Sequence, residues 1–338
     1  MLVNKYSSAD IIMREEFGWR LYKKDDIKLW FCGYLDDINI EGILVKAEYI
    51  VNNIEEENIV SSWLKTLCGH YAIVIEYKSS IITAVDKICS IPLFTSYKDN
   101  EILISNHAPL LKNKLDLDDS NLDKQAELEI AMSGYTIGKK TLHPQISQLC
   151  AGELLIVRGN ESEVREYYKY SPWKIKEKSK TQLKKELTKV SRKVLEDMVK
   201  GANGRQFVIP LSAGNDSRFI ASGLKELGVK NVFCFSYGIN NNFEVETAKK
   251  IAEKLDYQWL YVPLSIKSQT AFFKEKEFDD FWKFTDTLSN SPVLIDYSAV
   301  KKIKESGKIS KDAIFVNGNS GDFITGSHIK PEILSNNE

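Results

Sequence analysis

The sequence PLSAGNDSRF, residues Pro210–Phe219, decides the fold of the second half of the chain. The apolar run Gln206–Leu211 that leads into it predicts a short buried strand, and the run Ser217–Leu227 predicts a helix that ends at Gly228. The residues between strand and helix are small or polar. A strand, a tight turn and a helix in this order are typical of one repeat of a parallel α/β sheet.

The alternation of strands and helices continues after this turn. Apolar runs predict further strands at Val232–Phe235, Trp259–Val262 and Ala313–Val316, and a helix with one apolar face at Phe243–Leu255. This order predicts an α/β doubly wound parallel sheet. Ligands of such sheets bind beyond the carboxyl ends of the strands.

The turn after the first of these strands has the chemistry of a phosphate-binding loop. Small or absent side chains at Ser212, Ala213 and Gly214 let backbone N–H groups approach an anion at the positive end of the following helix. Asp216 would repel a bare phosphate, so its presence indicates an intervening cation, and Mg²⁺ prefers such oxygen ligands. The alternative is an ordinary turn with a capping Asp or Ser. A nucleotide with Mg²⁺ is the expected ligand.

Two common nucleotide motifs are absent from this loop. A Walker loop needs a lysine, and a dinucleotide fingerprint needs three glycines where only one is present. The loop instead resembles the pyrophosphatase loop of the asparagine synthetase family, Ser-Gly-Gly-x-Asp-Ser. Ser212, Gly214, Asp216 and Ser217 match that pattern, and Ala213 replaces its first glycine.

The sequence NGNSGDFITG, Asn317–Gly326, is similar to the second signature of the same family, Ser-Gly-Glu/Asp-Gly-x-Asp-Glu. Gly318 and Asp322 match, and the resemblance implies that Asp322 is the second carboxylate at the metal. Asn319 stands where the family has an acid, and Phe323 where it usually has Glu. An amide cannot act as a general base, so the resemblance supports nucleotide binding more strongly than catalysis.

The first half of the chain carries short β-branched or aromatic runs at Gly69–Ile75, Ile81–Val85, Pro92–Tyr97 and Ile102–His107. Many short strands with few helices predict an α+β domain of stacked antiparallel sheets. Their order, with DKICSIPLFTSY at Asp86–Tyr97, resembles the glutaminase domain of the same family. That resemblance implies a fold like that of the N-terminal-nucleophile hydrolases.

The residues for glutamine hydrolysis are not where this resemblance requires them. The family uses an N-terminal cysteine whose own amine acts as the base, and position two here is Leu2. The family's Asn-Gly-Glu segment appears as FCGYLDD, Phe31–Asp37, in which Cys32 replaces the asparagine. Cys32 lies among apolar residues and is expected to be a small buried hydrophobe. We therefore expect no glutaminase activity.

The resemblance implies two domains, a degenerate glutaminase-like domain at 1–170 and an ATP pyrophosphatase domain at 171–338 whose C-terminal part is missing. In this family, and in the more distantly similar β-lactam synthetases, ATP activates a carboxylate as an acyl-adenylate, and ammonia or an amine then attacks. The substrate is expected to be a small-molecule carboxylate, either aspartate or a sugar acid. The implied catalytic and metal residues are Asp216 and Asp322. The implied nucleotide-binding residues are Leu211, Ser212, Ala213, Gly214, Asn215, Asp216, Ser217, Ser236, Gly238 and Gly318.

Other interpretations remain open from the sequence. The chain could be a nucleotide-binding regulatory or scaffold protein without turnover, or a fragment of a split enzyme. An RNA-modifying enzyme with a similar loop is disfavoured because paired cysteines and a basic surface are missing. The expected protein partners are a second copy of the chain, forming a homodimer, or a complementing C-terminal fragment.

The composition supports an ordinary intracellular protein. The formal net charge of -1 gives no general attraction to nucleic acid, and the five cysteines and four histidines are too scattered for a zinc site or a disulfide scaffold. No signal core or membrane-spanning run is present, so we expect a cytoplasmic protein without membrane contact. A lysine-rich helix after residue 179 is expected to bury the apolar residues Leu183, Leu187, Val190, Val194 and Leu195.

Overall fold

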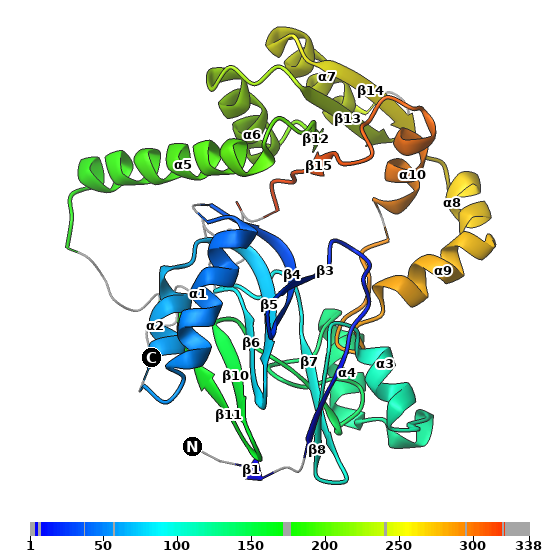
Figure 1. The fold of residues 1–338 in the computed structure, drawn as a ribbon. Helices are drawn as coiled ribbons and strands as arrows, with labels where there is room; N and C mark the ends of the chain where they lie inside the picture. Colours follow the sequence, from blue (N-terminus) through cyan, green and yellow to red (C-terminus); the bar gives the residue numbers. More distant parts are fainter. Residues whose placement is uncertain are drawn as a thin grey trace. The chain divides into compact units, whose positions relative to one another are not determined.

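The computed structural model describes residues 4–5, 8–36, 38–56, 58–171, 177–239, 242–294, 296–319 and 321. The chain divides into two compact units (Figure 1). The first unit combines Met1–Lys176 with Asp279–Pro292, and the second combines Glu177–Phe278 with Val293–Glu338.

The first unit contains two β-sheets. The larger sheet has the strand order β1-β11-β10-β6-β5-β4-β3 and is antiparallel throughout. The smaller sheet has the order β2-β8-β7-β9, in which only the pair β2 and β8 is parallel. The strands of the larger sheet are β1 (Asn4–Lys5), β3 (Arg20–Lys24), β4 (Ile27–Leu35), β5 (Gly69–Tyr77), β6 (Ser80–Val85), β10 (Glu153–Arg158) and β11 (Glu161–Glu166). Those of the smaller sheet are β2 (Ser8–Ile12), β7 (Phe94–Lys98), β8 (Glu101–Ser105) and β9 (Ile146–Gln148).

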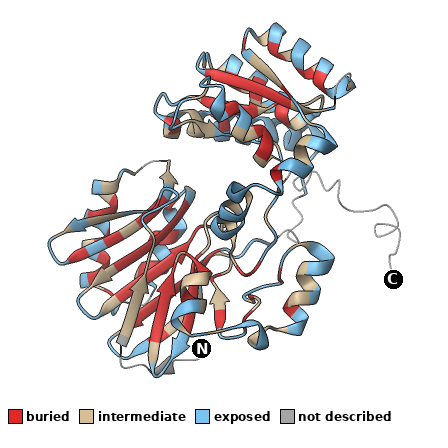
Figure 2. Cartoon of the chain, turned by 90° about the vertical axis from the view of Figure 1, so that its right-hand side faces the viewer, coloured by how far each residue is buried: buried red, intermediate tan, exposed pale blue. Residues whose placement is uncertain are grey.

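Strand β5 shows how the larger sheet is buried on both faces. Side chains alternate across a strand, so Ile73 and Ile75 join a cluster with the helices on one face. Ala72 and Val74 join a second cluster that includes Ile104 of the smaller sheet. The predicted antiparallel sheets are thus confirmed, and Figure 2 shows how buried residues follow the strands.

Helices cover the outer face of the larger sheet, whereas the sequence predicts few helices in this unit. Helix α1 (Ile40–Asn52) begins at Asn39, whose side chain accepts the Gly42 N–H at 2.9 Å, and buries an apolar stripe against the sheet beside α2 (Ile59–Thr66). Two further helices, α3 (Ala108–Lys114) and α4 (Lys124–Ser133), follow β8 in the sequence. The sequences of α1 and α2 contain several β-branched residues, which favour strands, so their helical periodicity was difficult to recognise.

The second unit is built on a four-stranded parallel sheet with the order β14-β13-β12-β15. One apolar cluster contains Phe207 and Ile209, and another contains Val208, so the sheet is covered on both faces. This arrangement confirms the predicted parallel sheet. The strands are β12 (Phe207–Pro210), β13 (Val232–Gly238), β14 (Gln258–Pro263) and β15 (Ile314–Phe315). The helices wholly within this unit are α5 (Lys180–Ala202), α6 (Asn215–Glu226), α7 (Phe243–Leu255), α8 (Ile266–Phe272) and α10 (Tyr297–Glu305), whereas α9 (Lys276–Thr285) begins in the second unit and ends in the first.

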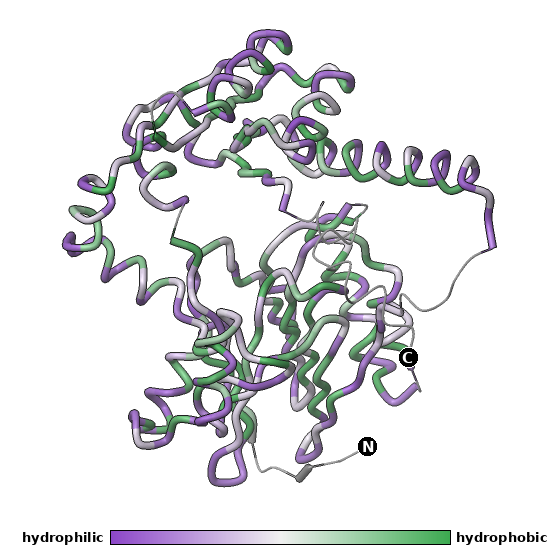
Figure 3. Tube along the Cα trace, turned by 180° about the vertical axis from the view of Figure 1, so that it is seen from behind, coloured by the Kyte–Doolittle hydropathy of each residue, from purple (hydrophilic) through white to green (hydrophobic). Residues whose placement is uncertain are grey.

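Helix α5 buries less than the sequence predicts. Of the five apolar residues expected in its buried face, Leu195 is buried, whereas Leu183, Leu187, Val190 and Val194 are exposed. Figure 3 shows hydrophobic (green) and hydrophilic (purple) residues alternating along this helix. Only its C-terminal part packs on α6, where a Cβ on Gly223 would lie 2.4 Å from Leu195 Cδ1. A helical period identifies an apolar stripe but not the length over which a neighbour covers it. In the described ranges, every helix is too short or too polar to cross a lipid bilayer.

The segment Asp279–Pro292 lies in the second half of the sequence but belongs to the first unit. Leu288 is buried in a cluster with Phe94 and Leu103 of the smaller sheet. Its carbonyl accepts the Leu142 N–H at 2.6 Å, and the Ser289 carbonyl accepts the Thr136 N–H at 2.8 Å. The core of the first unit therefore includes a residue from a distant part of the chain.

Candidate nucleotide-binding site

The candidate site lies at the end of β12, where the order of the strands in the parallel sheet reverses. Strand β12 has β13 on one side and β15 on the other, so the loops after β12 and β15 leave the same edge of the sheet side by side. This is the topological switch point at which open α/β sheets bind their ligands. The loop after β12 contains Leu211–Gly214, and the loop after β15 contains Val316–Asn319.

The first loop is held by its own serines. The Ser212 N–H donates to Ser217 Oγ, and the Gly214 N–H donates to Ser212 Oγ, both at 3.1 Å. Helix α6 then begins at Asn215, and the preceding N-cap residue, Gly214, has no side chain to cap the N–H groups of the first turn. Uncapped N–H groups at the positive end of a helix favour an anion.

The second loop lies directly against Asp216. A Cβ on Gly318 would lie 2.6 Å from Asp216 Cβ, and a Cβ on Gly321 would lie 2.2 Å from Asp216 Oδ1. Neither position has room for a side chain without movement, so glycine permits this approach. The Gly321 N–H donates to the Gly318 carbonyl at 3.0 Å, which closes the turn. The structure thus brings together Asp216 and Gly318, which lie about a hundred residues apart in the sequence.

Of the other residues of the second signature, the structure describes Asn319 but not Asp322 or Phe323. Asn319 is exposed, and its N–H donates to Asn317 Oδ1 at 3.3 Å. Asp322 and Phe323 lie outside the described residues. Among the described residues, no three His, Cys, Asp or Glu side chains form a metal-binding group. A Mg²⁺ ion commonly uses only one or two carboxylates, with phosphate and water as its other ligands, so Asp216 alone fits that role.

Ser236 and Gly238 end the neighbouring strand β13 at the same edge. Ser236 is buried, and its hydroxyl donates to the Leu211 carbonyl at 2.6 Å and accepts from Trp259 Nε1 at 3.0 Å. The Gly238 carbonyl accepts the Leu264 N–H at 2.8 Å. The Ser236 hydroxyl therefore links the carboxyl end of β12 and the end of β13 to a side chain from the start of β14, a structural use that the sequence did not reveal.

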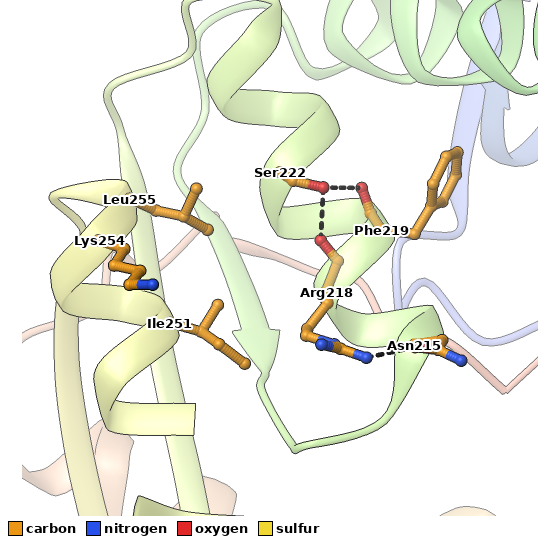
Figure 4. Close-up of a pocket in the computed structure, with 7 residues that line it drawn as sticks. All are labelled: Asn215, Arg218, Phe219, Ser222, Ile251, Lys254 and Leu255. Atoms are coloured by element: carbon orange, nitrogen blue, oxygen red, sulfur yellow. Dashed lines mark hydrogen bonds between the residues drawn. The ribbon is translucent and has the colours of Figure 1, made fainter. Parts of the chain in front are cut away.

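A pocket of about 460 Å³ lies beside the first loop, between α6 and α7 (Figure 4). Of its lining residues, only Asn215 is among the predicted nucleotide-binding residues. The seven lining residues are Asn215, Arg218, Phe219, Ser222, Ile251, Lys254 and Leu255.

In the first unit, Asp86 organises the loop after β6. Its buried carboxylate accepts the N–H groups of Tyr71 at 3.0 Å and Ile88 at 2.8 Å, and the Ser90 hydroxyl at 2.6 Å. Ser90 Oγ in turn lies 2.7 Å from His70 Nδ1. A carboxylate only accepts, so Ser90 donates to Asp86 and His70 Nδ1 donates to Ser90. Asp86 thereby fixes the loop and the imidazole tautomer together.

We expect Asp86→Ala to lower the free energy of unfolding by about 3 kcal/mol, because several buried donors lose their acceptor at once. The matched control is Asp123→Ala, which removes a single helix cap whose carboxylate accepts from Gln125 and Ala126, and should cost about 1 kcal/mol. Urea unfolding of both variants measures the difference. Equal losses would show that Asp86 acts only as a local turn residue.

The cysteines of both units are mostly protected. Burial raises the pKa of Cys32 to about 11 and that of Cys234 to about 12. Cys32 Sγ lies 3.4 Å from the Phe17 carbonyl, to which it donates. A thiol with a raised pKa is a poor nucleophile at neutral pH. Leu2 lies outside the described residues.

A thiol-specific reagent at pH 8 should therefore separate the cysteines by exposure. Cys68 is exposed and should react within the native protein, whereas Cys32 and Cys234 should react only after unfolding. Mass spectrometry of the labelled peptides in native buffer and in urea gives the measurement. Rapid native labelling of Cys32 would contradict its assignment as a buried hydrophobe.

Comparison with known proteins gives one family match. Residues 46–168 match the glutamine amidotransferase domain family. No curated protein matches the chain. Among solved structures, an NH3-dependent NAD synthetase from Campylobacter jejuni is 19% identical with a TM-score of 0.29, and the match covers 42% of this chain and 59% of that one. A glutamine phosphoribosylpyrophosphate amidotransferase from B. subtilis is 10% identical with a TM-score of 0.26, over 90% of this chain and 64% of that one.

The chain thus covers less than two thirds of either of these structures. The family match lies wholly within the first unit and includes Asp86 and the loop that it organises. The first unit of this chain is therefore similar to a glutamine amidotransferase domain.

Proposed function

We propose that the protein is an ATP-dependent, amide-forming ligase. It adenylates a substrate carboxylate with release of pyrophosphate and then transfers ammonia or an amine to the activated carbonyl. The observation that carries this proposal is the contact of the two switch-point loops at Asp216, where Gly318 and Gly321 leave no room for a side chain. A carboxylate packed against Gly318 and Gly321, next to an uncapped helix N-terminus, suits a metal-bound polyphosphate.

Each residue of the site has a role in this proposal. Backbone N–H groups of Ser212–Asp216 would bind the phosphates at the start of α6, those of Ser212 and Gly214 in exchange for their hydrogen bonds to serine hydroxyls. Asp216, with Asp322, would hold Mg²⁺, which neutralises phosphate charge when bound. Gly238 and Ser236 would border the nucleoside by their position at the end of β13. The role of Asp322 and the identity of the nucleotide follow from the resemblance to asparagine synthetases.

The substrate in this proposal is aspartate or a sugar acid, and the nitrogen comes from ammonia or an amine. The match to an amidotransferase domain supports nitrogen transfer in general. Glutamine hydrolysis by the first unit is not part of the proposal, because burial raises the pKa of Cys32 to about 11 and keeps its thiol inert.

The test is carboxylate-dependent exchange of labelled pyrophosphate into ATP in the presence of Mg²⁺. Aspartate and a panel of uronic acids serve as substrates, and glutarate controls for carboxylate without an amino or hydroxyl group. Exchange that requires both Mg²⁺ and one of these acids supports the proposal. Absence of ATP binding in a direct titration would overturn it.

A regulatory or scaffold protein that binds ATP without turnover is the second candidate. Asn319 favours it, because an exposed amide stands where a general base would be needed. Tight ATP binding with no exchange for any carboxylate would identify this second function.

A further inference from the structure

We propose that the pocket between α6 and α7 binds a small organic anion, with a carboxylate or phosphate head and a short aliphatic part. The pocket does not use Asp216 or the second loop, so this site is separate from the proposed ATP site. It shares with that site only Asn215, the first residue of α6.

The charge of the lining selects an anion. Arg218 of α6 and Lys254 of α7 both line the pocket, and none of its lining residues is acidic. Figure 4 shows the Lys254 ammonium directed from α7 toward α6. Among the described residues, Lys254 makes no ion pair, so its charge is available. The positive end of α6 adds to this field at Asn215.

The Arg218 side chain is already positioned. Its Nε donates to the Gly214 carbonyl at 3.2 Å, and its Nη2 donates to Asn215 Oδ1. These bonds hold the guanidinium along the first turn of α6, while its remaining N–H donors are free of them. A preorganised guanidinium loses less side-chain entropy when it binds a carboxylate or a phosphate.

The apolar lining selects an aliphatic part. Ile251 and Leu255 are half-buried and point from α7 into the pocket (Figure 4). A short alkyl chain would cover them while its charged head lies between Arg218 and Lys254. The volume of about 460 Å³ lies in the range of small-molecule sites.

The test uses three probes of matched length on the full chain: pentanoate, butyl phosphate and pentylamine. Calorimetric titration should detect binding of pentanoate, butyl phosphate or both, and no binding of pentylamine. Binding by only one of the anions assigns the head group. Equal binding of pentylamine, or no binding of either anion, would overturn the proposal.

Variants then locate the binding. Lys254→Gln should weaken anion binding about fivefold, and Lys254→Glu should abolish it. Lys250→Gln is the matched control, because Lys250 is exposed on the same helix but lies outside the pocket. Anion binding that survives Lys254→Glu would place the probes elsewhere, for instance in the loop at Ser212, and would refute the pocket as the site. ATP titrations of the same variants test the proposed function separately.

Discussion

Asp216→Asn should reduce carboxylate-dependent pyrophosphate exchange on the order of 100-fold, because an amide does not replace a carboxylate as a metal ligand. The side chain keeps its size, so the packing of Gly318 and Gly321 against it should be retained. The measurement compares exchange rates and ATP affinity of wild type and variant at fixed Mg²⁺. Circular dichroism verifies that the variant is folded.

The matched control is Asp256→Asn in the same unit. Asp256 ends α7 in the left-handed conformation, which asparagine also adopts readily, and its side chain is 98% exposed. This variant should exchange at the wild-type rate. If Asp216→Asn keeps full activity and Mg²⁺ dependence, Asp216 is not the metal ligand and the proposed site is wrong.

Gly33→Ala should lower the free energy of unfolding by about 4 kcal/mol, the largest stability effect that we expect from one added methyl group. Gly33 pairs with Tyr71 across β4 and β5 of the larger sheet. Its φ is +103°, and a Cβ there would lie 1.9 Å from the His70 carbonyl oxygen. The strands would have to separate to admit the methyl group. Urea unfolding followed by tryptophan fluorescence measures the loss.

The loss at Gly33 has two causes, the positive φ and the close contact with the His70 carbonyl, and Gly134→Ala separates them. Gly134 ends α4 with a φ of +84°, and nothing lies within 4 Å of a Cβ built there. Only the backbone conformation is then unfavourable, so the expected cost is about 1 kcal/mol. A similar loss in both variants would mean that the close approach of β4 and β5 at Gly33 contributes little.

The local order of the second unit could be predicted from its sequence. The helix expected at Phe243–Leu255 is α7, and the strand expected at Gln206–Leu211 contains β12. These elements combine a clear periodicity of apolar residues with turn residues at their ends, so the local sequence is enough to predict them. The candidate site could be anticipated for the same reason, because its two loops each follow a buried strand.

Long-range packing could not be predicted in the same way. No local pattern indicates that Leu288 packs with Phe94 in the first unit, or that the Ser236 hydroxyl is used by Leu211 and Trp259. The pocket between α6 and α7 is a further case, since Arg218 and Lys254 line one pocket only when these two helices pack together. Periodicity reports which face of an element is apolar, and the partner of that face depends on the fold.

The assignment of Asp279–Pro292 to the first unit means that the chain passes between the units at three points. During synthesis, the core of the first unit therefore cannot be completed by Leu288 until residues 177–278 of the second unit have been synthesised. A chain cut after Lys176 would expose Phe94, Leu103 and Leu111 at the place that Leu288 fills. Residues 1–176 alone therefore lack part of the core of the first unit, and separate expression of that unit requires the Asp279–Pro292 segment to be joined to it.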